Sequence, residues 1–280
     1  MSSKTFKIKN PIDQTELLIR HWPCKKPVAV MSLVHGLGEH SGRYESFAPD
    51  LVKANIAVVA IDLRGHGQSG GKRGVCTDYA LLQSDREALL NQSRALYPET
   101  PHIVYGHSLG GGLVMDYGRE AAADVRAMIA SAPFIDLPKS PPAIVGLIAK
   151  IMRRLNPQGT ISQPLTGEKI STLPEEQARY LGDPLNHNHI SFGLAVDAVE
   201  AGKRVAASAS DWTLPLLLMH AKGDQLTDFT ASEIFALSAK NVTFNAFGTS
   251  EHEMHHDTPR DDVVRLMIDF ITEHATTQVA

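Results

Sequence analysis

The chain has 280 residues, of which 43% are hydrophobic and 21% are charged, as expected for one large α/β domain or one domain with an insertion. Its formal net charge is −4, and no long run of either sign occurs. This composition argues against a nucleic-acid-binding protein and against a polybasic surface for anionic membranes.

The N-terminal segment predicts a sheet edge and no targeting signal. It reads MSSKTFKIKNPIDQTE, without the continuous apolar stretch of a signal peptide. The runs TFKIKN and TELLIRHW alternate apolar and polar residues, and they predict an antiparallel hairpin around residues 11–14. No apolar run approaches the roughly 18 residues of a membrane span. Because Cys24 and Cys76 are too few for a disulfide framework, we expect a reduced, cytoplasmic setting.

Strand-like and helix-like stretches then alternate along the chain. Strands are expected at PVAVMSLVHG, IAVVAID, HIVYGHS, VRAMIASAP, LPLLLMHAKGD and VTFNAFG. Helices are expected at residues 44–53, 78–96, 109–121, 230–239 and 260–273. With the N-terminal hairpin this makes eight strands, and the alternation predicts an α/β fold with a mostly parallel sheet and helices on both faces.

The alternation stops between residues 134 and 204, where we expect no strand. An apolar helix at 144–155 follows a cluster of prolines there, and it has more apolar residues than one buried face requires. We therefore expect a core of residues 1–133 and 205–280, with residues 134–204 inserted as a lid. The additional apolar residues of this helix have three possible roles. They line a channel, with Ile148 and Ile151 among the lining residues, or they contact lipid, or they pack on the core.

The stretch VYGHSLGGG at 104–112 places Ser108 between Gly106 and Gly110, behind a strand and ahead of a helix. One interpretation is a tight turn in which the serine caps the helix. The other is a nucleophile elbow, a strained strand-to-helix turn that exposes a reactive hydroxyl at the sheet edge. The strand and helix on either side favour the elbow, so Ser108 is the expected nucleophile.

A serine nucleophile requires a base and an acid, which in this fold follow it in the order acid, histidine. Asp224 follows one late strand, and His252 follows the next, where loops leave the carboxyl edge of the sheet. We expect Asp228 to open the next helix instead. His255 is the second choice for the base, and a metal site in HEMHH, using the i, i+4 pair His252 and His256, lacks the H-E-x-x-H pattern.

An oxyanion hole completes this chemistry. One donor is expected to be the backbone amide of Leu109, directly after the serine. The other is expected to be the amide of Leu37, because the glycines on both sides of it in HGLGE leave that amide exposed. The alternative is a simple glycine turn.

Five motifs together resemble the monoacylglycerol lipase and lysophospholipase branch of the α/β-hydrolase superfamily. They are HGLGEHSGRY at 35–44, DLRGHGQSGGKRG at 62–74, GHSLGG at 106–111, DPL at 183–185 and HEMHHDTP at 252–259. The resemblance covers nearly the whole chain and is weak only in the insertion. It implies that the first histidine of HEMHHDTP is catalytic, and that the insertion is a lid lining an acyl channel. It also implies that Glu39, His40 and Arg43 bind the polar head of the alcohol, unless they only brace the loop.

The sequence thus predicts a serine hydrolase that cleaves lipid-like carboxylic esters through an acyl-enzyme, without metal or cofactor. Its expected partners are small ester or lipid substrates, with transient contact to a membrane surface and no nucleic acid. A carboxylesterase or thioesterase for small or aromatic esters is the first alternative. A hydrolase-like protein that binds a ligand without turnover is the second.

Overall fold

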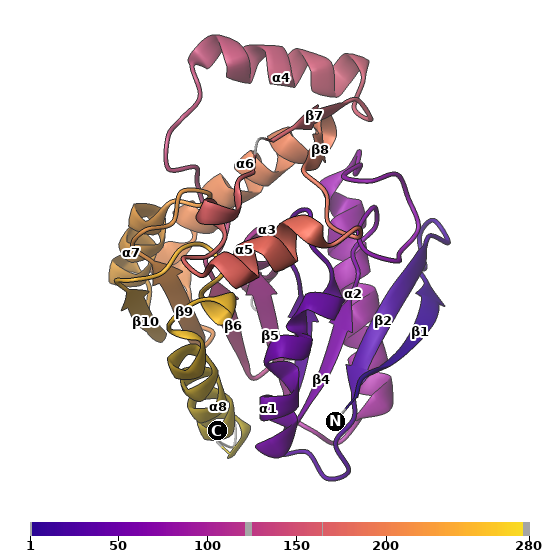
Figure 1. Cartoon of the computed structure of the whole chain (residues 1–280), viewed down its shortest axis with the longest axis vertical. Coiled ribbons are helices and arrows are strands. Elements are labelled where there is room, and N and C mark those ends of the chain that lie inside the picture. The colour runs from indigo at the N-terminus through magenta and orange to yellow at the C-terminus, as the bar shows by residue number, and fades with distance from the viewer. Residues whose placement is uncertain (1, 121–124, 164, 277–280) are drawn as a thin grey trace.

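An eight-stranded sheet forms the centre of the computed structural model, which describes residues 2–120, 125–163 and 165–276 (Figure 1). The strand order is β1-β2-β4-β3-β5-β6-β9-β10, and β2 runs antiparallel to both of its neighbours while the other pairs are parallel. The strands are β1 (Lys4–Lys9), β2 (Glu16–Trp22), β3 (Ala29–Val34), β4 (Ile56–Ile61), β5 (His102–His107), β6 (Ala127–Ser131), β9 (Leu216–Ala221) and β10 (Val242–Phe247). The predicted α/β class, the N-terminal hairpin and the eight strands are confirmed.

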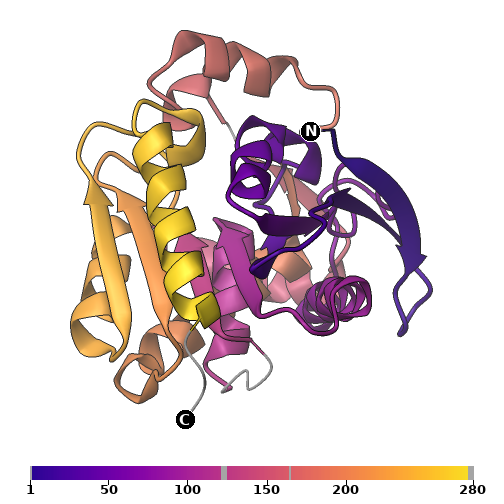
Figure 2. The same cartoon turned by 90° about the horizontal axis from the view of Figure 1, so that it is seen from below.

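Helices cover both faces of this sheet (Figure 2). They are α1 (Ala48–Lys53), α2 (Tyr79–Leu96), α3 (Leu109–Gly118), α7 (Phe229–Ser238) and α8 (Arg260–Thr276). Buried side chains of α1 and α8 pack in one apolar cluster, and those of α2, α3 and α7 pack in the other. The continuous apolar strands lie between the two clusters, and every residue of β3, β4, β5, β6 and β9 is buried.

Two of the predicted helices are divided or shortened in the structure. The helix expected at 44–53 is divided into a 3-10 turn, η1 (Ser41–Ser46), and α1, because Pro49 is favoured in the first turn of a new helix and cannot donate an amide hydrogen bond within one. The helix expected at 109–121 ends at Gly118, and residue 121 lies outside the described residues.

The insertion between β6 and β9 rises over the carboxyl edge of the sheet (Figure 1). It contains α4 (Ala143–Leu155), β7 (Thr160–Ser162), η2 (Gly167–Lys169), α5 (Pro174–Gly182), β8 (His189–Ser191), α6 (Phe192–Ala207) and η3 (Ala209–Asp211). The expectation of no strand here was wrong, because β7 and β8 pair as a short antiparallel ladder. The expected boundary at 204 and 205 falls inside α6, whose Ala198, Ala201 and Val205 pack in the core cluster.

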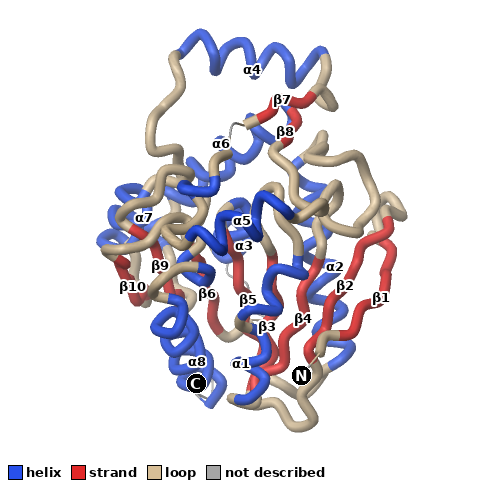
Figure 3. The backbone as a smooth tube through the Cα atoms, viewed as in Figure 1, coloured by secondary structure: helices blue, strands red, loops and turns tan. Residues whose placement is uncertain are grey.

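Helix α4 lies at the outer end of the insertion, beyond α6 (Figure 3). None of its residues is buried, and Ile144 and Leu155 are 60% and 76% exposed. Two ion pairs join it to α6, Arg153 with Asp197 and Lys150 with Glu200. No helix among the described residues is long and apolar enough to cross a membrane.

Candidate active site

Ser108 forms a strained turn between β5 and α3. Its φ of 53° and ψ of −118° lie where a residue with a Cβ is rarely found. A Cβ on Gly106 would lie 2.3 Å from the Gly110 carbonyl oxygen, and a Cβ on Gly110 would lie 2.4 Å from the carbonyl oxygen of His35, so both positions require glycine. The Ser108 side chain makes no cap hydrogen bond to α3, which contradicts the helix-cap interpretation.

Asp224 and His252 form a buried pair in the loops after β9 and β10. The Nδ1 atom of His252 donates to Asp224 Oδ2 over 2.7 Å, and Asp224 Oδ1 accepts from the backbone amides of Leu226 and Thr227. Because a carboxylate only accepts, this bond leaves the Nε2 atom of His252 free to take a proton. The order along the chain is therefore serine, acid, histidine, as the elbow requires.

The charges of this pair support each other. Burial alone would lower the pKa of His252, but the Asp224 carboxylate outweighs burial and raises that pKa above its usual value. Burial would likewise raise the pKa of Asp224, but the imidazoles of His252 and His220 hold it well below its usual range. Asp224 therefore stays ionised at neutral pH.

The competing residues have other contacts. Asp228 accepts from the amide of Thr230 and caps α7, as expected. His255 is buried against Tyr44 with ring centroids 5.2 Å apart, and neither of its ring nitrogens has a hydrogen-bond partner among the described residues. His256 is buried, and its Nδ1 atom forms a hydrogen bond with the Glu253 carboxylate. Neither of these histidines contacts Asp224.

Three residues that the sequence did not indicate contact the pair. His220 is fully buried, donates from Nε2 to Asp224 Oδ2 over 3.1 Å, and accepts from Ser232 at Nδ1. Thr227 Oγ1 lies 2.8 Å from the same carboxylate oxygen. His107 lies beside His252 with ring centroids 4.7 Å apart, and burial lowers the pKa of His107 to about 4, so it is neutral.

The amides of Leu37 and Leu109 are available to a ligand. Neither donates a hydrogen bond within the ranges that the structure describes, and both residues border the same cavity as Ser108. The loop that carries Leu37 abuts the elbow, since a Cβ on Gly36 would lie 2.9 Å from Ser108 Cβ. The Gly36 amide donates to Glu39 Oε1 over 2.6 Å, which holds the loop in shape.

A cavity of about 710 Å³ joins this site to the insertion. Its lining from the core includes Leu37, Ser108, Leu109, His252 and Glu253. Most of its lining from the insertion is apolar and includes Leu137, Val145, Leu147, Ile161, Ile170, Ile190, Val196 and Val199. Ile148 and Ile151 are not among the described residues that line it, so the channel-lining positions expected on α4 were wrong.

The three residues expected to bind the alcohol form a braced cluster. Glu39 accepts from Gly36 and from Tyr44, and it alone of the three borders the cavity. Arg43 donates to Glu253, and its guanidinium lies 4.6 Å from the centre of the Tyr180 ring. His40 bonds to Asp183 rather than to the cavity.

The segment HEMHH also places three potential metal ligands together. Donor atoms of Glu253, His255 and His256 lie within 4.8 Å of one another, and His252 is not among them. The guanidinium of Arg43 already binds the Glu253 carboxylate. Burial alone would raise the pKa of Glu253, but the charge of Arg43 and the hydrogen bond to His256 outweigh burial and hold that pKa well below its usual range. This donor set therefore fits an ion pair better than a second cation.

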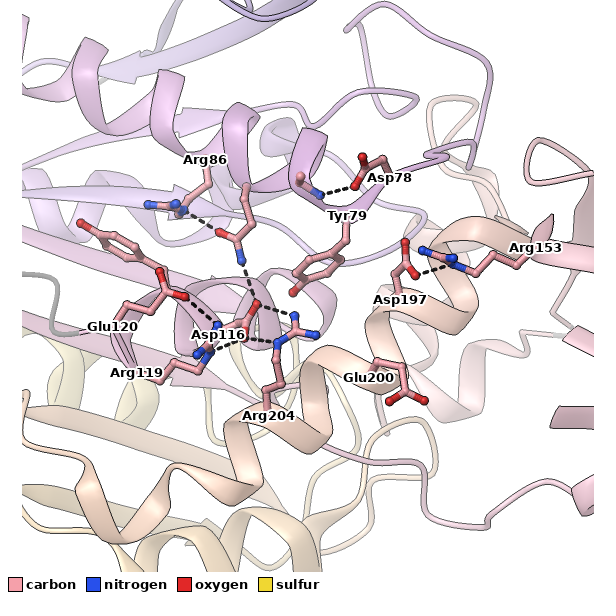
Figure 4. Close-up of a pocket in the computed structure, with 13 residues that line it drawn as sticks. Asp78, Tyr79, Arg86, Asp116, Arg119, Glu120, Arg153, Asp197, Glu200 and Arg204 are labelled. Carbon is pink, nitrogen blue, oxygen red and sulfur yellow. Dashed lines mark hydrogen bonds and ion pairs between the residues drawn. The ribbon is translucent and has the colours of Figure 1, made fainter. Parts of the chain in front are cut away.

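A second hollow of about 420 Å³ lies between α2, α3 and α6 and is lined mainly by charged side chains (Figure 4). Its charges pair with one another: Arg204 and Arg119 both bind the buried carboxylate of Asp116, and Arg153 binds Asp197. The network fixes α6 to α3, the helix that begins directly after Ser108. It contains none of the expected catalytic residues.

Comparison with known proteins places the chain among hydrolases. The family model Hydrolase_4, described as serine aminopeptidase, S33, matches residues 25–259. The monoacylglycerol lipase of Mycolicibacterium smegmatis is 30% identical over 255 residues, 90% of this chain and 91% of that protein. The monoglyceride lipase of Rattus norvegicus is 29% identical over 88% of this chain and 83% of its own.

Solved structures agree with this fold. The monoacylglycerol lipase of Paleococcus ferrophilus superposes with a TM-score of 0.81 at 26% identity, covering 98% of this chain and all of that one. A monoglyceride lipase from Saccharomyces cerevisiae, solved with a substrate analogue, has a TM-score of 0.88 at 20% identity over 99% of this chain and 97% of its own. The chain thus belongs to the Hydrolase_4 family, described as serine aminopeptidase, S33, and is an α/β-hydrolase similar to the monoacylglycerol lipases.

Proposed function

We propose that the protein is a carboxylic ester hydrolase that cleaves monoacylglycerol-type lipids through an acyl-enzyme on Ser108. The observation that carries the proposal is the cavity, which Ser108 and His252 both border and which the lid lines with apolar side chains. Asp224 bonds to the Nδ1 atom of His252. The relatives named monoacylglycerol or monoglyceride lipase support the substrate class.

In the proposed mechanism, His252 Nε2 takes the proton of Ser108 as its oxygen attacks the ester carbonyl. Asp224 holds the opposite nitrogen and stabilises the imidazolium that forms. The imidazolium then gives its proton to the leaving alcohol oxygen, and a water molecule repeats the attack to release the fatty acid. The ionised state of Asp224 is required throughout, and its lowered pKa supports it.

The negative oxygen of each tetrahedral intermediate would be bound by the amides of Leu37 and Leu109. Both lack a partner within the described chain, and both border the cavity beside Ser108. In general, removing one such donor costs about 10²- to 10³-fold in kcat.

The lid would bind the acyl chain. Its apolar lining can stabilise each bound methylene by about 0.8 kcal/mol relative to water. On the other side of the ester, Glu39 borders the cavity and would accept a hydrogen bond from a hydroxyl of the alcohol. His40 and Arg43 would support Glu39 without bordering the cavity. Contact with a lipid surface through α4, and the expected cytoplasmic location, remain part of this proposal.

The test is a substrate panel with an active-site label. A fluorophosphonate should modify the wild type and fail to modify Ser108→Ala. The panel holds monoacylglycerols, lysophospholipids, an acyl thioester and p-nitrophenyl esters from acetate to palmitate. Highest kcat/KM on monoacylglycerols supports the proposal, whereas a preference for thioesters or acetate contradicts the lipid assignment. Labelling without turnover of any ester contradicts the enzymatic function.

A further inference from the structure

The motif DPL at 183–185 forms a compact turn between α5 and β8. Asp183 Oδ1 accepts the amide of Leu185 over 2.9 Å, and the Asp183 carbonyl accepts the amide of Asn186 over 3.1 Å. This geometry fixes the second carboxylate oxygen of Asp183 in one direction. That oxygen points out of the lid toward the core.

The turn contacts the loop of Leu37 at two points. Asp183 Oδ2 accepts from His40 Nε2 over 2.9 Å, and the amide of His187 donates to the carbonyl of Gly38 over 2.9 Å. A Cβ on Gly38 would lie 2.1 Å from the His187 carbonyl oxygen, so the two backbones touch. Gly38 also has a φ of 79°, which favours glycine.

The His40 ring is held in a single tautomer by this arrangement. Its Nδ1 accepts from the amide of Gly42 over 3.1 Å, so Nε2 carries the proton that Asp183 accepts. Glu39, the residue before it, accepts from the amide of Gly36. The loop is therefore fixed internally at Gly36, through Glu39, and from the lid at Gly38 and His40. The free amide of Leu37 lies between Gly36 and Gly38 in the chain.

We propose that Asp183 and His40 are positioning residues that hold the loop so that the Leu37 amide meets the oxyanion. This inference rests on the proposed function, in which Leu37 is an oxyanion donor. It gives His40 a different role from the substrate binding that the sequence indicated. It also makes the lid necessary for reactions of substrates too short to touch its apolar lining.

The expected effect is on the transition state rather than on substrate binding. A displaced donor weakens the bond to the oxyanion, which exists only after attack. Breaking the pair should therefore lower kcat for an acetate ester by about 10- to 100-fold, with KM nearly unchanged. The affinity of a trifluoromethyl ketone, whose hemiketal mimics the tetrahedral state, should fall by a similar factor.

The experiment compares Asp183→Asn, His40→Ala and their double variant. Asparagine retains an oxygen for the Leu185 amide, but its NH₂ group faces the Nε2–H of His40, so two donors meet. A change of the His40 tautomer would restore that contact only by losing the hydrogen bond from the Gly42 amide to Nδ1. Asp197→Asn is the matched control, because it breaks the Arg153 ion pair within the lid without touching the Leu37 loop. kcat and KM for p-nitrophenyl acetate, the ketone inhibition constant and the melting temperature are measured for each.

Parallel losses in kcat and ketone affinity for both single variants, with a double variant no worse than either, support the pair acting as one unit. Rates equal to those of Asp197→Asn in folded protein overturn the inference, as does a rise in KM alone. If one variant melts below the assay temperature, the other decides by the same criteria. Activity that survives in Ser108→Ala contradicts the proposed function instead.

Discussion

The carboxylate of Asp224 accepts hydrogen bonds from the side chains of His252 and His220 and from two backbone amides. A buried carboxylate with so many donors remains charged, and its charge favours the protonated form of His252. In the proposed mechanism, that preference stabilises the step in which the imidazole holds the serine proton. Single residues here set the protonation states on which the chemistry depends.

The identity of the base gives the first prediction. His252→Ala should lower kcat/KM by about 10⁴-fold or more, because a serine without its base is not activated. His255→Ala should cost far less, since His255 does not contact Asp224 and stacks on Tyr44. Steady-state kinetics on one soluble ester measure both, with melting temperatures as the control for folding. An inactive His255→Ala beside an active His252→Ala would reverse the assignment.

The pH dependence gives the second prediction. His252 acts as a base only when neutral, and its pKa is raised by Asp224. The kcat/KM profile should therefore fall as the pH drops through a midpoint above the ordinary histidine value of about 6.5. In Asp224→Asn the carboxylate charge is lost, so the midpoint of the residual activity should move to lower pH. A wild-type midpoint well below 6.5 would contradict the charge pairing.

At the scale of elements, α4 has two apolar faces with different surroundings. Val145, Leu147 and Ala149 border the cavity, whereas Ile148 and Leu155 do not. The side chains of Val145, Leu147 and Ile148 are all about half exposed, so the cavity rather than exposure distinguishes the two faces. A helix that lines a channel on one face and meets solvent on the other has more apolar residues than packing alone requires. This explains the surplus that the sequence showed.

The two faces give the third prediction. Val145→Asp should lower kcat/KM for octanoate and longer esters and spare acetate, because each methylene in an apolar channel contributes about four-fold. Ile148→Asp, one turn along the other face, should leave the chain-length series of soluble esters near that of the wild type. The measurement is kcat/KM from acetate to decanoate in both variants. Equal losses at all lengths in Val145→Asp would exclude α4 from the acyl channel.

Elements with many consecutive apolar residues were predictable from the sequence, and short ones were not. Strands that are buried on both faces, such as β4 with its run VVAI, are too short and too uniformly apolar to be mistaken for amphipathic helices. β7 and β8 have three residues each, which is too few to show the alternation of apolar and polar residues that predicts a strand. They form because the chain folds back on itself, which is a tertiary effect.

The same distinction applies to the site. The position of Ser108 is encoded locally by the glycines and by the change from strand to helix. The bond from His40 to Asp183 joins residues 143 positions apart, and no local pattern predicts such a contact. His220 precedes Asp224 by four residues across a turn, and only the folded loop brings its Nε2 to the carboxylate.

At the scale of the whole molecule, the parallel sheet brings distant parts of the chain together. Ser108 follows β5, Asp224 follows β9 and His252 follows β10, and the carboxyl ends of parallel strands meet at one edge. The lid is inserted at that same edge, after β6. The proposed catalytic residues and the insertion therefore share one end of the molecule, and α4 lies at its outer limit (Figure 1).

This arrangement gives the last prediction, on lipid surfaces. The net charge of −4 opposes binding to anionic membranes, and Lys150 and Arg153 of α4 are already paired with acids of α6. Binding to vesicles should therefore depend on the apolar face of α4. The fraction bound to neutral phosphatidylcholine vesicles should be similar at low and at high salt.

Co-sedimentation with phosphatidylcholine vesicles measures this. Leu155→Asp should lower the bound fraction at least several-fold, because an exposed leucine that enters the acyl region contributes about 1.5 to 3 kcal/mol and an aspartate cannot follow it. Ile12→Asp is the matched control, since Ile12 is 67% exposed but lies in the turn between β1 and β2, outside the insertion. Equal binding by both variants would show that α4 does not reach the membrane. Binding that disappears at high salt would show that charge, rather than apolar contact, attaches the enzyme to its substrate surface.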